Sequence, residues 1–537
     1  MKTPAYITTA SLEEYTGSWT RVQAAHLGRR LLFGVTRDNI ARLSSMPMSE
    51  AVDSLLMVSQ QPQSPPAYST LNGIQQGSTW LDAPYDLRFE PDWLLMLQAW
   101  WVGEMLYQSV DKPPTITEKM TLFWHNHFAT EANMVNDARY MYKQNALFRQ
   151  YALGNFKELV KHITLDPAML RFLNGSDNVK EHPNENFGRE LQELFTIGKG
   201  TSGSTTTYTE EDIKQAARIL TGWVEVTPPI SVVFIADNHD SGNKQFSASY
   251  GNTIIKGGEA EKDARKELDE LITMIFANQE TSKFIIRKLY CWFVDCNINE
   301  TIEKNIIAPL AEIFIKNNFE VKPVLQTLFK STHFYNEAIY GAIIKNPVEY
   351  VVGTIRAFPS ATFYPAPTAY QEQYIAWRTL HKTMASIQME LLSPPNVAGW
   401  PAYWQKPSFY QMWINLATLQ KRSRFITDVC ANGLLLDDKT TNTLIDVIPL
   451  AMQSSTPDDI NVLINDWCEI AFPLPAPDEV KKQLKQIVLN GLPDYEWTAE
   501  WNAYVNNQAD IQKKKNVEDK LRALLRYILS MAEYQVS

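Results

Sequence analysis

Residues 182–198 read HPNENFGRELQELFTIG and combine polar and apolar side chains at helical spacing. In a helix, Asn186, Glu190 and Glu193 lie on one face, because four and then three residues separate them. The remaining residues are apolar enough for this helix to be buried. Buried carboxylates need charged or hydrogen-bonding partners. The segment therefore predicts a buried helix that brings polar groups into a site.

Helical periodicity also dominates elsewhere, for example over residues 93–107 and 262–294, where apolar residues recur at intervals of three and four. The main strand candidate is residues 230–236, a β-branched run that follows two prolines. These patterns predict a mainly α fold, with a multi-helical globular core, a short β-hairpin insertion and a C-terminal helical extension.

The length of 537 residues, 45% of them hydrophobic, allows two or three packed units. We expect an N-terminal segment over residues 1–25 and a helical core over residues 26–421. The core contains the strand insertion, at about residues 224–258. A C-terminal helical subdomain over residues 422–537 is expected because the distinctive motifs stop there.

Two segments carry signals for the start of a helix. Residues 115–118 (TITE) have the spacing of a capping box after two prolines, which predicts a helix start. Thr209 precedes three acidic residues and predicts a second start, for a helix that stops at Gly222.

The chain carries 50 Lys and Arg against 60 Asp and Glu, a net charge of −10, without a basic run. Nucleic acid and anionic membranes are therefore poor partners. No segment has the roughly 18 uncharged apolar residues of a membrane span. Residues 1–10 lack the apolar core of a signal peptide, which favours a soluble, cytoplasmic protein.

The four cysteines are few for this length. Cys291 and Cys296 are the only close pair, and they have four residues between them rather than the two of a redox or zinc motif. We therefore expect no structural disulfide framework.

A metal site is one reading of the histidines in the sequence FWHNHF, residues 123–128. Its ligands for zinc, manganese or iron would come from His125, His127, Glu190, Glu193 and Asp240. On a helix, however, residues i and i+2 point about 200° apart, so both histidines cannot bind one ion unless the helix ends there. The favoured alternative is buried histidines in a structural polar network.

Catalysis by carboxylates is a second reading of the opening segment. If Glu190 and Glu193 approach each other without a cation, one pKa rises, which provides a general acid beside a general base. Asn186 and Arg189 would then bind substrate. Alternatively, Arg189, one turn from Glu193, neutralises a carboxylate in a buried network.

His239 and Asp240 form the best loop candidate, because they offer a proton carrier and a charge in a polar turn. Lys244 could hold an anionic substrate group beside them. The alternative is a turn in which Asp240 caps the backbone, His239 is solvated and Lys244 is a surface charge.

Residues 393–404 form a loop rich in proline and aromatic residues, in which Trp400 could stack on a sugar or receive a peptide. A core plug is the alternative, with Gly399 required for a tight bend. The chain contains no GxSxG, GxxxxGK[ST] or HExxH motif and no convincing GxGxxG, so the common hydrolase, nucleotide-binding and dehydrogenase classes lose support.

The motifs at residues 117–128, 185–198, 208–223, 239–244 and 394–401 occur in the order of one family. The chain resembles the bacterial family called domain of unknown function 1800 over about His26 to Leu416. The resemblance implies a protein partner, because members are encoded near a sulfatase-like group, domain of unknown function 1501. Many members look exported.

Two functions remain open. The first is a hydrolase, with or without a divalent metal, that acts on a small or carbohydrate-like substrate. The second is a non-catalytic scaffold or protein-binding component. An open cleft shared by His127, Glu190, Glu193 and His239 would favour the enzyme, whereas burial with every polar atom paired would favour the scaffold.

Overall fold

The computed structural model describes residues 11–107, 113–200 and 207–537 and confirms a mainly α fold. The first half of the core consists of α1 (Arg21–Leu31), α2 (Arg37–Ser44), α3 (Met48–Leu55), α4 (Glu90–Leu106), α5 (Thr117–His127), α6 (Ala132–Val135), α7 (Ala138–Gln150), α8 (Phe156–Thr164) and α9 (Pro167–Phe172).

The opening motif and the strand insertion follow. Their elements are α10 (Glu185–Glu190), the π-helix η2 (Leu191–Thr196), α11 (Glu210–Ile219), β1 (Trp223–Val226), β2 (Ser231–Phe234), β3 (Lys244–Gln245), the short 3-10 helix η4 (Ala248–Tyr250), β4 (Ile254–Ile255) and α12 (Glu261–Ala277). The core then continues with α13 (Gln279–Phe293), α14 (Glu300–Ile302), α15 (Ala308–Lys316), α16 (Val321–Lys330), α17 (Pro347–Ala357) and α18 (Tyr370–Ser386).

The C-terminal part contains α19 (Leu416–Thr427), β5 (Leu434–Leu435), β6 (Asn442–Thr443), α20 (Val447–Met452), α21 (Ile460–Ala471), α22 (Asp478–Leu489), α23 (Tyr495–Val505) and α24 (Ile511–Ser530). Short 3-10 or π turns are η1 (Gly175–Asp177), η3 (Ala236–Asn238), η5 (Glu303–Ile307), η6 (Glu337–Ile339), η7 (Ala361–Phe363), η8 (Pro401–Tyr403), η9 (Phe409–Trp413), η10 (Asp428–Asn432) and η11 (Ala532–Gln535).

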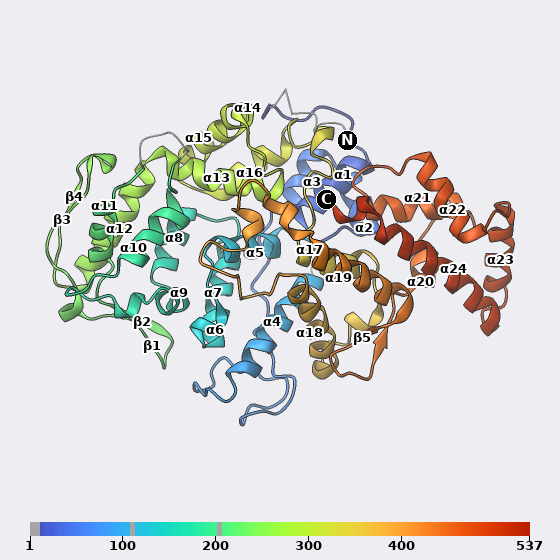
Figure 1. Cartoon of the computed structure of the whole chain (residues 1–537), viewed down its shortest axis with the longest axis horizontal. Helices are drawn as coiled ribbons and strands as arrows, with labels where there is room; N and C mark the ends of the chain where they lie inside the picture. The colour runs from blue at the N-terminus through green and yellow to red at the C-terminus, as the bar shows by residue number, and fades with distance from the viewer. Residues whose placement is uncertain (1–10, 108–112, 201–206) are drawn as a thin grey trace.

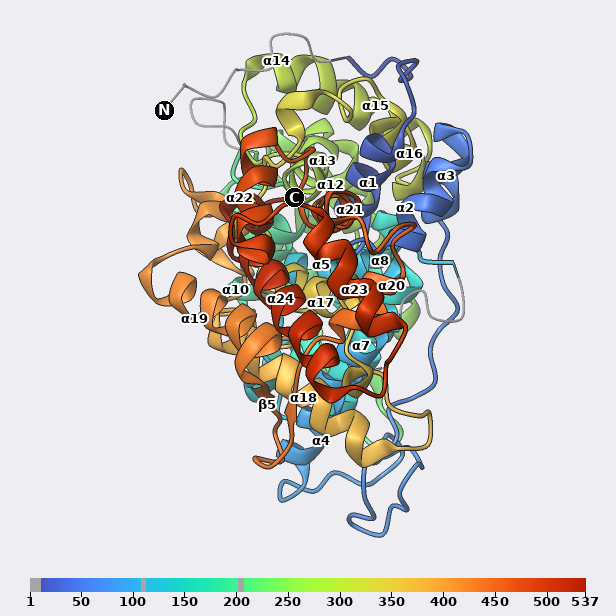
Figure 2. The ribbon, with the colours of Figure 1, turned by 90° about the vertical axis from the view of Figure 1, so that its right-hand side faces the viewer.

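The molecule is elongated, with β1 to β4 near one end of its long axis and α21 to α24 at the other (Figure 1). Figure 2 shows the second end, where α24 packs against α20 to α23. In the described ranges, the strands form three antiparallel pairs, β1–β2, β3–β4 and β5–β6. The first two pairs lie between α11 and α12 and confirm the hairpin insertion. No helix within those ranges is long and apolar enough to cross a membrane.

Large aromatic side chains fill the core around α4 and α5. Trp101 and Trp124 are fully buried, and α4 packs closely against α18. This close approach requires Gly103, because a Cβ there would lie 2.8 Å from the ring of Trp377. The core therefore depends on tight packing of aromatic residues against small ones.

Both predicted helix starts are confirmed, but only the second has the expected cap. Thr209 caps α11 as predicted, and it does so in a capping box with Asp212. By contrast, α5 begins two residues after Thr115 without a side-chain cap, so the capping box predicted there is wrong. The carboxylate of Glu118, its expected partner, instead accepts hydrogen bonds from buried Arg149 and Trp101.

The C-terminal helices contact the N-terminal ones. Arg21 in α1 forms an ion pair with Glu469 in α21 at 2.5 Å, and Arg37 pairs with Asp466 at 2.6 Å. A C-terminal subdomain that begins at residue 422 stays a prediction. Residues 1–10, on which the expected absence of a leader rests, lie outside the described residues.

A disulfide joins Cys291, in the last turn of α13, to Cys296, just beyond that helix, with the two Cα atoms 4.1 Å apart. The sequence predicted no structural disulfide framework, but this one pair is bonded, because the chain turns back after Phe293. Cys430 and Cys468 are buried free thiols.

Candidate functional site

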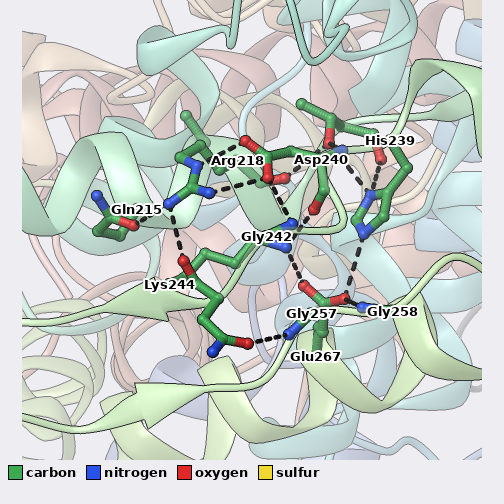
Figure 3. Close-up of polar contacts among 12 residues, drawn as sticks. Gln215, Arg218, His239, Asp240, Gly242, Lys244, Gly257, Gly258 and Glu267 are labelled. Carbon is green, nitrogen blue, oxygen red and sulfur yellow. Dashed lines mark hydrogen bonds and ion pairs between the residues drawn. The ribbon is translucent and has the colours of Figure 1, made fainter.

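Five charged or titratable side chains meet between α11, β3 and α12, and we call them the His239 cluster (Figure 3). The cluster consists of Arg218, His239, Asp240, Lys244 and Glu267. It brings together three predicted site residues, His239, Asp240 and Lys244, and it adds Arg218 and Glu267.

Glu267 lies at the centre of this cluster. Its Oε2 contacts Nζ of Lys244, and its Oε1 accepts hydrogen bonds from His239 Nε2 at 3.2 Å and from the Gly258 N–H at 3.0 Å. The side chains of Lys244, His239 and Glu267 are at most 1% exposed. Burial lowers the pKa of Lys244, and the carboxylate of Glu267 opposes this shift.

The ring of His239 has acceptors on both sides. Its Nδ1 lies 2.9 Å from the carbonyl oxygen of Thr221, opposite Glu267. The Thr221 hydroxyl donates to the Arg218 carbonyl at 2.7 Å and accepts from the Asp240 N–H at 2.9 Å. The Thr221 hydroxyl also lies 3.1 Å from His239 Nδ1, so Thr221 contacts the ring through both its hydroxyl and its carbonyl oxygen. The expectation that a non-catalytic His239 is solvated is wrong.

Asp240 forms an ion pair and also caps its turn. Two hydrogen bonds of 2.6 and 2.9 Å join its carboxylate to Arg218, and the Gly242 N–H donates a third at 2.9 Å. Burial raises the pKa of Asp240, but these bonds outweigh burial and leave the pKa below its ordinary value. Asp240 is therefore held as an ionised carboxylate.

The pair Glu190 and Glu193 lies apart from the His239 cluster, at the junction of α10 and η2. Glu193 accepts a hydrogen bond from Tyr208 at 3.0 Å and pairs with Lys199 at 2.7 Å. Glu190 is half-buried, and burial, followed by the charge of Glu193, raises its pKa. The two carboxylates thus have different environments, because Lys199 lies beside Glu193 whereas no such ion pair holds Glu190 in the described residues.

Arg189 and Asn186 lie on the outer side of α10. Arg189 forms two hydrogen bonds with Glu210, at 2.9 and 2.6 Å, rather than the predicted pairing within its own helix. Asn186 is exposed, and its N–H is capped by Asn184. Neither residue lies with the His239 cluster.

His127 supports the π-helix. Because a π-helix shifts the ordinary pattern of hydrogen bonds, some of its carbonyls need other donors. The Nε2 of His127 donates to the Phe195 carbonyl at 3.0 Å, and Lys288 donates to the Leu194 carbonyl at 3.3 Å and to His127 Nδ1 at 3.2 Å. Burial, and then the charge of Lys288, holds the pKa of His127 well below its usual value.

His125 packs among aromatic rings. Its ring makes edge-to-face contacts with Trp101 and Trp400, and each ring centroid is 5.7 Å away. Burial lowers the pKa of His125 to about 3. Where the structure describes the chain, no three His, Cys, Asp or Glu side chains are grouped as a metal site requires. The structure does not bring the predicted metal ligands together.

Trp400 is 1% exposed and forms part of the core. Its N–H donates to Asn126 at 3.0 Å, and Gly399 has a φ of +87° that a side chain would strain. The loop is therefore the core plug, and Trp400 offers no surface on which a sugar can stack.

The largest of the cavities that we describe, about 690 Å³, opens between α12 and the segment of η4 and β4. Its buried apolar side chains are Tyr250, Ile255 and Met274. Its other lining residues are Ser249, Gly251, Thr253, Lys266, Asp269, Glu270, Thr273, Ala277 and Asn278. None of the site residues predicted from sequence lines it.

Polar contacts attach the cavity wall at three points. The Tyr250 hydroxyl donates to Gln192 of η2 at 2.8 Å, and Ser247 donates twice, at 2.7 Å, to Asp212 of α11. The third attachment is the contact of Lys244 with Glu267. The motifs that contain Gln192 and Asp212 thus both contact one segment, residues 244–258.

Sequence reasoning missed the roles of Gln192, Asp212 and Glu267. One signal was present for Glu267, which shares the apolar face of α12 with Ala264 and Leu271. A glutamate at such a position requires a buried partner.

A family model described as a protein of unknown function (DUF1800) matches residues 26–536, and the chain belongs to this family. The match continues past Leu416, the end suggested by the motifs, and includes the C-terminal helices. No curated protein and no solved structure is similar enough to match.

Proposed function

We propose that this protein is a non-catalytic ligand-binding protein, and that its polar motif residues hold the wall of the binding cavity. The observation that carries this proposal is the buried contact of Lys244 with Glu267, which joins β3 to α12. The cavity opens between α12 and η4 and β4, which follow β3 in the same inserted segment. A group that is fully buried and paired supports structure rather than turnover.

The chemistry of the cavity supports a neutral ligand with an apolar body. The floor is apolar, whereas Thr253, Thr273 and Asn278 carry uncharged polar groups at the rim. The charged rim residues are paired with neighbours: Lys266 with Glu270 at 3.6 Å, and Asp269 with Lys161 at 2.8 Å. Pockets of this size with a few polar groups are typical of small-molecule sites. An alkyl or aryl glycoside has this combination of groups.

Isothermal titration with neutral alkyl and aryl glycosides tests the proposal. Ala277→Trp places a large side chain in the cavity, and Ala499→Trp makes the same change on exposed α23. We expect a glycoside that binds the wild type and the Ala499 variant equally, and the Ala277 variant at least tenfold more weakly. No binding across the series, or equal binding by both variants, would reject the proposal.

A hydrolase that uses Glu190 and Glu193 is the second candidate function. Its support is the raised pKa of Glu190 beside a carboxylate paired with Lys199, because such a difference separates an acid from a base. Nitrophenol release from the aryl glycosides measures this activity. Turnover that Glu190→Gln abolishes in folded protein would replace the binding proposal with the enzyme.

A further inference from the structure

A second cavity, of about 310 Å³, lies between α1 and the connection from α21 to α22. Apolar residues form part of its wall, and these include Val22, Ala25, Phe472, Pro473 and Ala476. Its charged lining residues are Arg21, Arg29, Arg37, Asp466, Glu469 and Lys481. The cavity thus combines a hydrophobic wall with a group of ions at the place where the N-terminal and C-terminal helices meet.

Both acidic residues of this cavity are held by arginines. The carboxylate of Glu469 accepts two hydrogen bonds from Arg21, at 2.8 and 2.5 Å. The carboxylate of Asp466 accepts one from Arg37 at 2.6 Å. Two further cations line the cavity, and among the described residues neither of them forms an ion pair with a carboxylate of its lining.

Arg29 is the first of these cations, and it is 6% exposed. Its Nη2 donates to the main-chain carbonyl oxygen of Glu469, whereas its Nε has no partner among the described residues. Burial lowers the pKa of Arg29 to about 10, so the guanidinium stays protonated at neutral pH. Arg29 also borders a cavity of about 20 Å³, whose lining includes Glu349 and Ser537. Those two residues do not line the larger cavity, so they supply no acceptor inside it.

Lys481 of α22 is the second cation. Its side chain is 35% exposed, and its ion-pair partner in the described part of the chain, Asp478, is 4.0 Å away and 92% exposed. An ion pair of such exposed groups contributes little to stability. The ammonium group of Lys481 is therefore available to an anion in the cavity.

We propose that this cavity binds a carboxylate that has a short aryl or alkyl body. The carboxylate accepts hydrogen bonds from Arg29 and Lys481, and such charge-assisted bonds are stronger than neutral ones. The body packs against Phe472 and Ala25, which are at most 2% exposed. At about 30 Å³ for each non-hydrogen atom, roughly ten such atoms fill the cavity.

The bound carboxylate links the two ends of the chain, because Arg29 belongs to α1 and Lys481 to α22. The site is separate from the cavity at α12, for which we infer a neutral ligand. The carboxylate site therefore does not depend on the proposed function.

Isothermal titration with phenylacetate and phenylacetamide tests this site, because the two probes share a shape and only phenylacetate is charged. We expect phenylacetate to bind the wild type roughly tenfold more tightly than the amide. Lys481→Met should weaken phenylacetate binding by roughly fivefold or more. Lys482→Met, which removes an exposed lysine paired with Glu479, should leave it unchanged.

Equal affinity for the acid and the amide, no binding of either, or the same phenylacetate affinity in both lysine variants would overturn the proposal. Ala277→Trp fills the cavity at α12 and should leave phenylacetate binding unchanged, so weaker binding by this variant would also overturn it. Crystals soaked in 4-bromophenylacetate should show an anomalous peak beside Phe472, and a map without one rejects the site.

Discussion

Nζ of Lys244 on β3 contacts Oε2 of Glu267 on α12, and both side chains are at most 1% exposed. His239 occupies the other carboxylate oxygen. One glutamate therefore serves two groups from the inserted segment. This arrangement holds that segment on α12.

Glu267→Gln should destabilise the protein by about 3 kcal/mol or more, because it leaves Lys244 buried without its counter-charge. The double variant Lys244→Met, Glu267→Gln should recover at least half of this loss. Glu261→Gln, which breaks an exposed pair on the same helix, should cost less than about 1 kcal/mol. Urea unfolding of the three variants measures these differences, and equal losses for Glu267→Gln and Glu261→Gln would contradict the account.

Tyr250→Phe should cost about 1 to 2 kcal/mol, because it leaves the side-chain oxygen of Gln192 without its donor inside the protein. The matched change Tyr495→Phe, at a residue that is 66% exposed, should be nearly neutral. Chemical denaturation compares the two, and an unaffected Tyr250 variant would show that this attachment does not matter.

Gly399→Ala should destabilise the core by about 2 kcal/mol or more. Its φ is +87°, and a Cβ would lie 2.4 Å from the Asn126 carbonyl oxygen. Gly73→Ala is the control, since Gly73 has a φ of +77° with no atom within 4 Å of the added carbon. It should cost about 1 kcal/mol. Similar losses at both positions would show that the Trp400 loop relaxes.

Glu104 predicts a pH dependence of stability. Burial raises its pKa from 4.5 to about 7. The folded state therefore binds more protons than the unfolded state between these values, and stability falls as pH rises from about 4.5 to 7. The difference in unfolding free energy between Glu104→Gln and wild type should therefore be about 2 kcal/mol more favourable to the variant at pH 8 than at pH 4.5. The same change at exposed Glu50 should give no such difference, and parallel pH profiles of Glu104→Gln and wild type would contradict the shift.

The fold was predictable because its signals are local. Apolar periodicity indicated the long helices, Thr209 marked the start of α11, and the β-branched run indicated the first hairpin. The π-helix was not predictable, because its carbonyls depend on His127 and Lys288, and these residues are 161 positions apart.

The candidate site was predictable only in part. His239, Asp240 and Lys244 do lie together, because a short turn connects them. Their partner Glu267 comes from another helix, and spacing does not reveal such a long-range contact. Glu190 and Glu193 form a second, separate pair, which shows that helical spacing places residues on a face but does not say what covers it.

Hydrogen–deuterium exchange of residues 244–258 tests most directly whether the polar motifs hold the cavity wall. In Glu267→Gln, we expect the amides of this segment to exchange at least tenfold faster than in the wild type, while α4 and α18 keep their protection. Glu261→Gln should leave the segment unchanged. Wild-type exchange over residues 244–258 in the folded Glu267 variant would contradict the account.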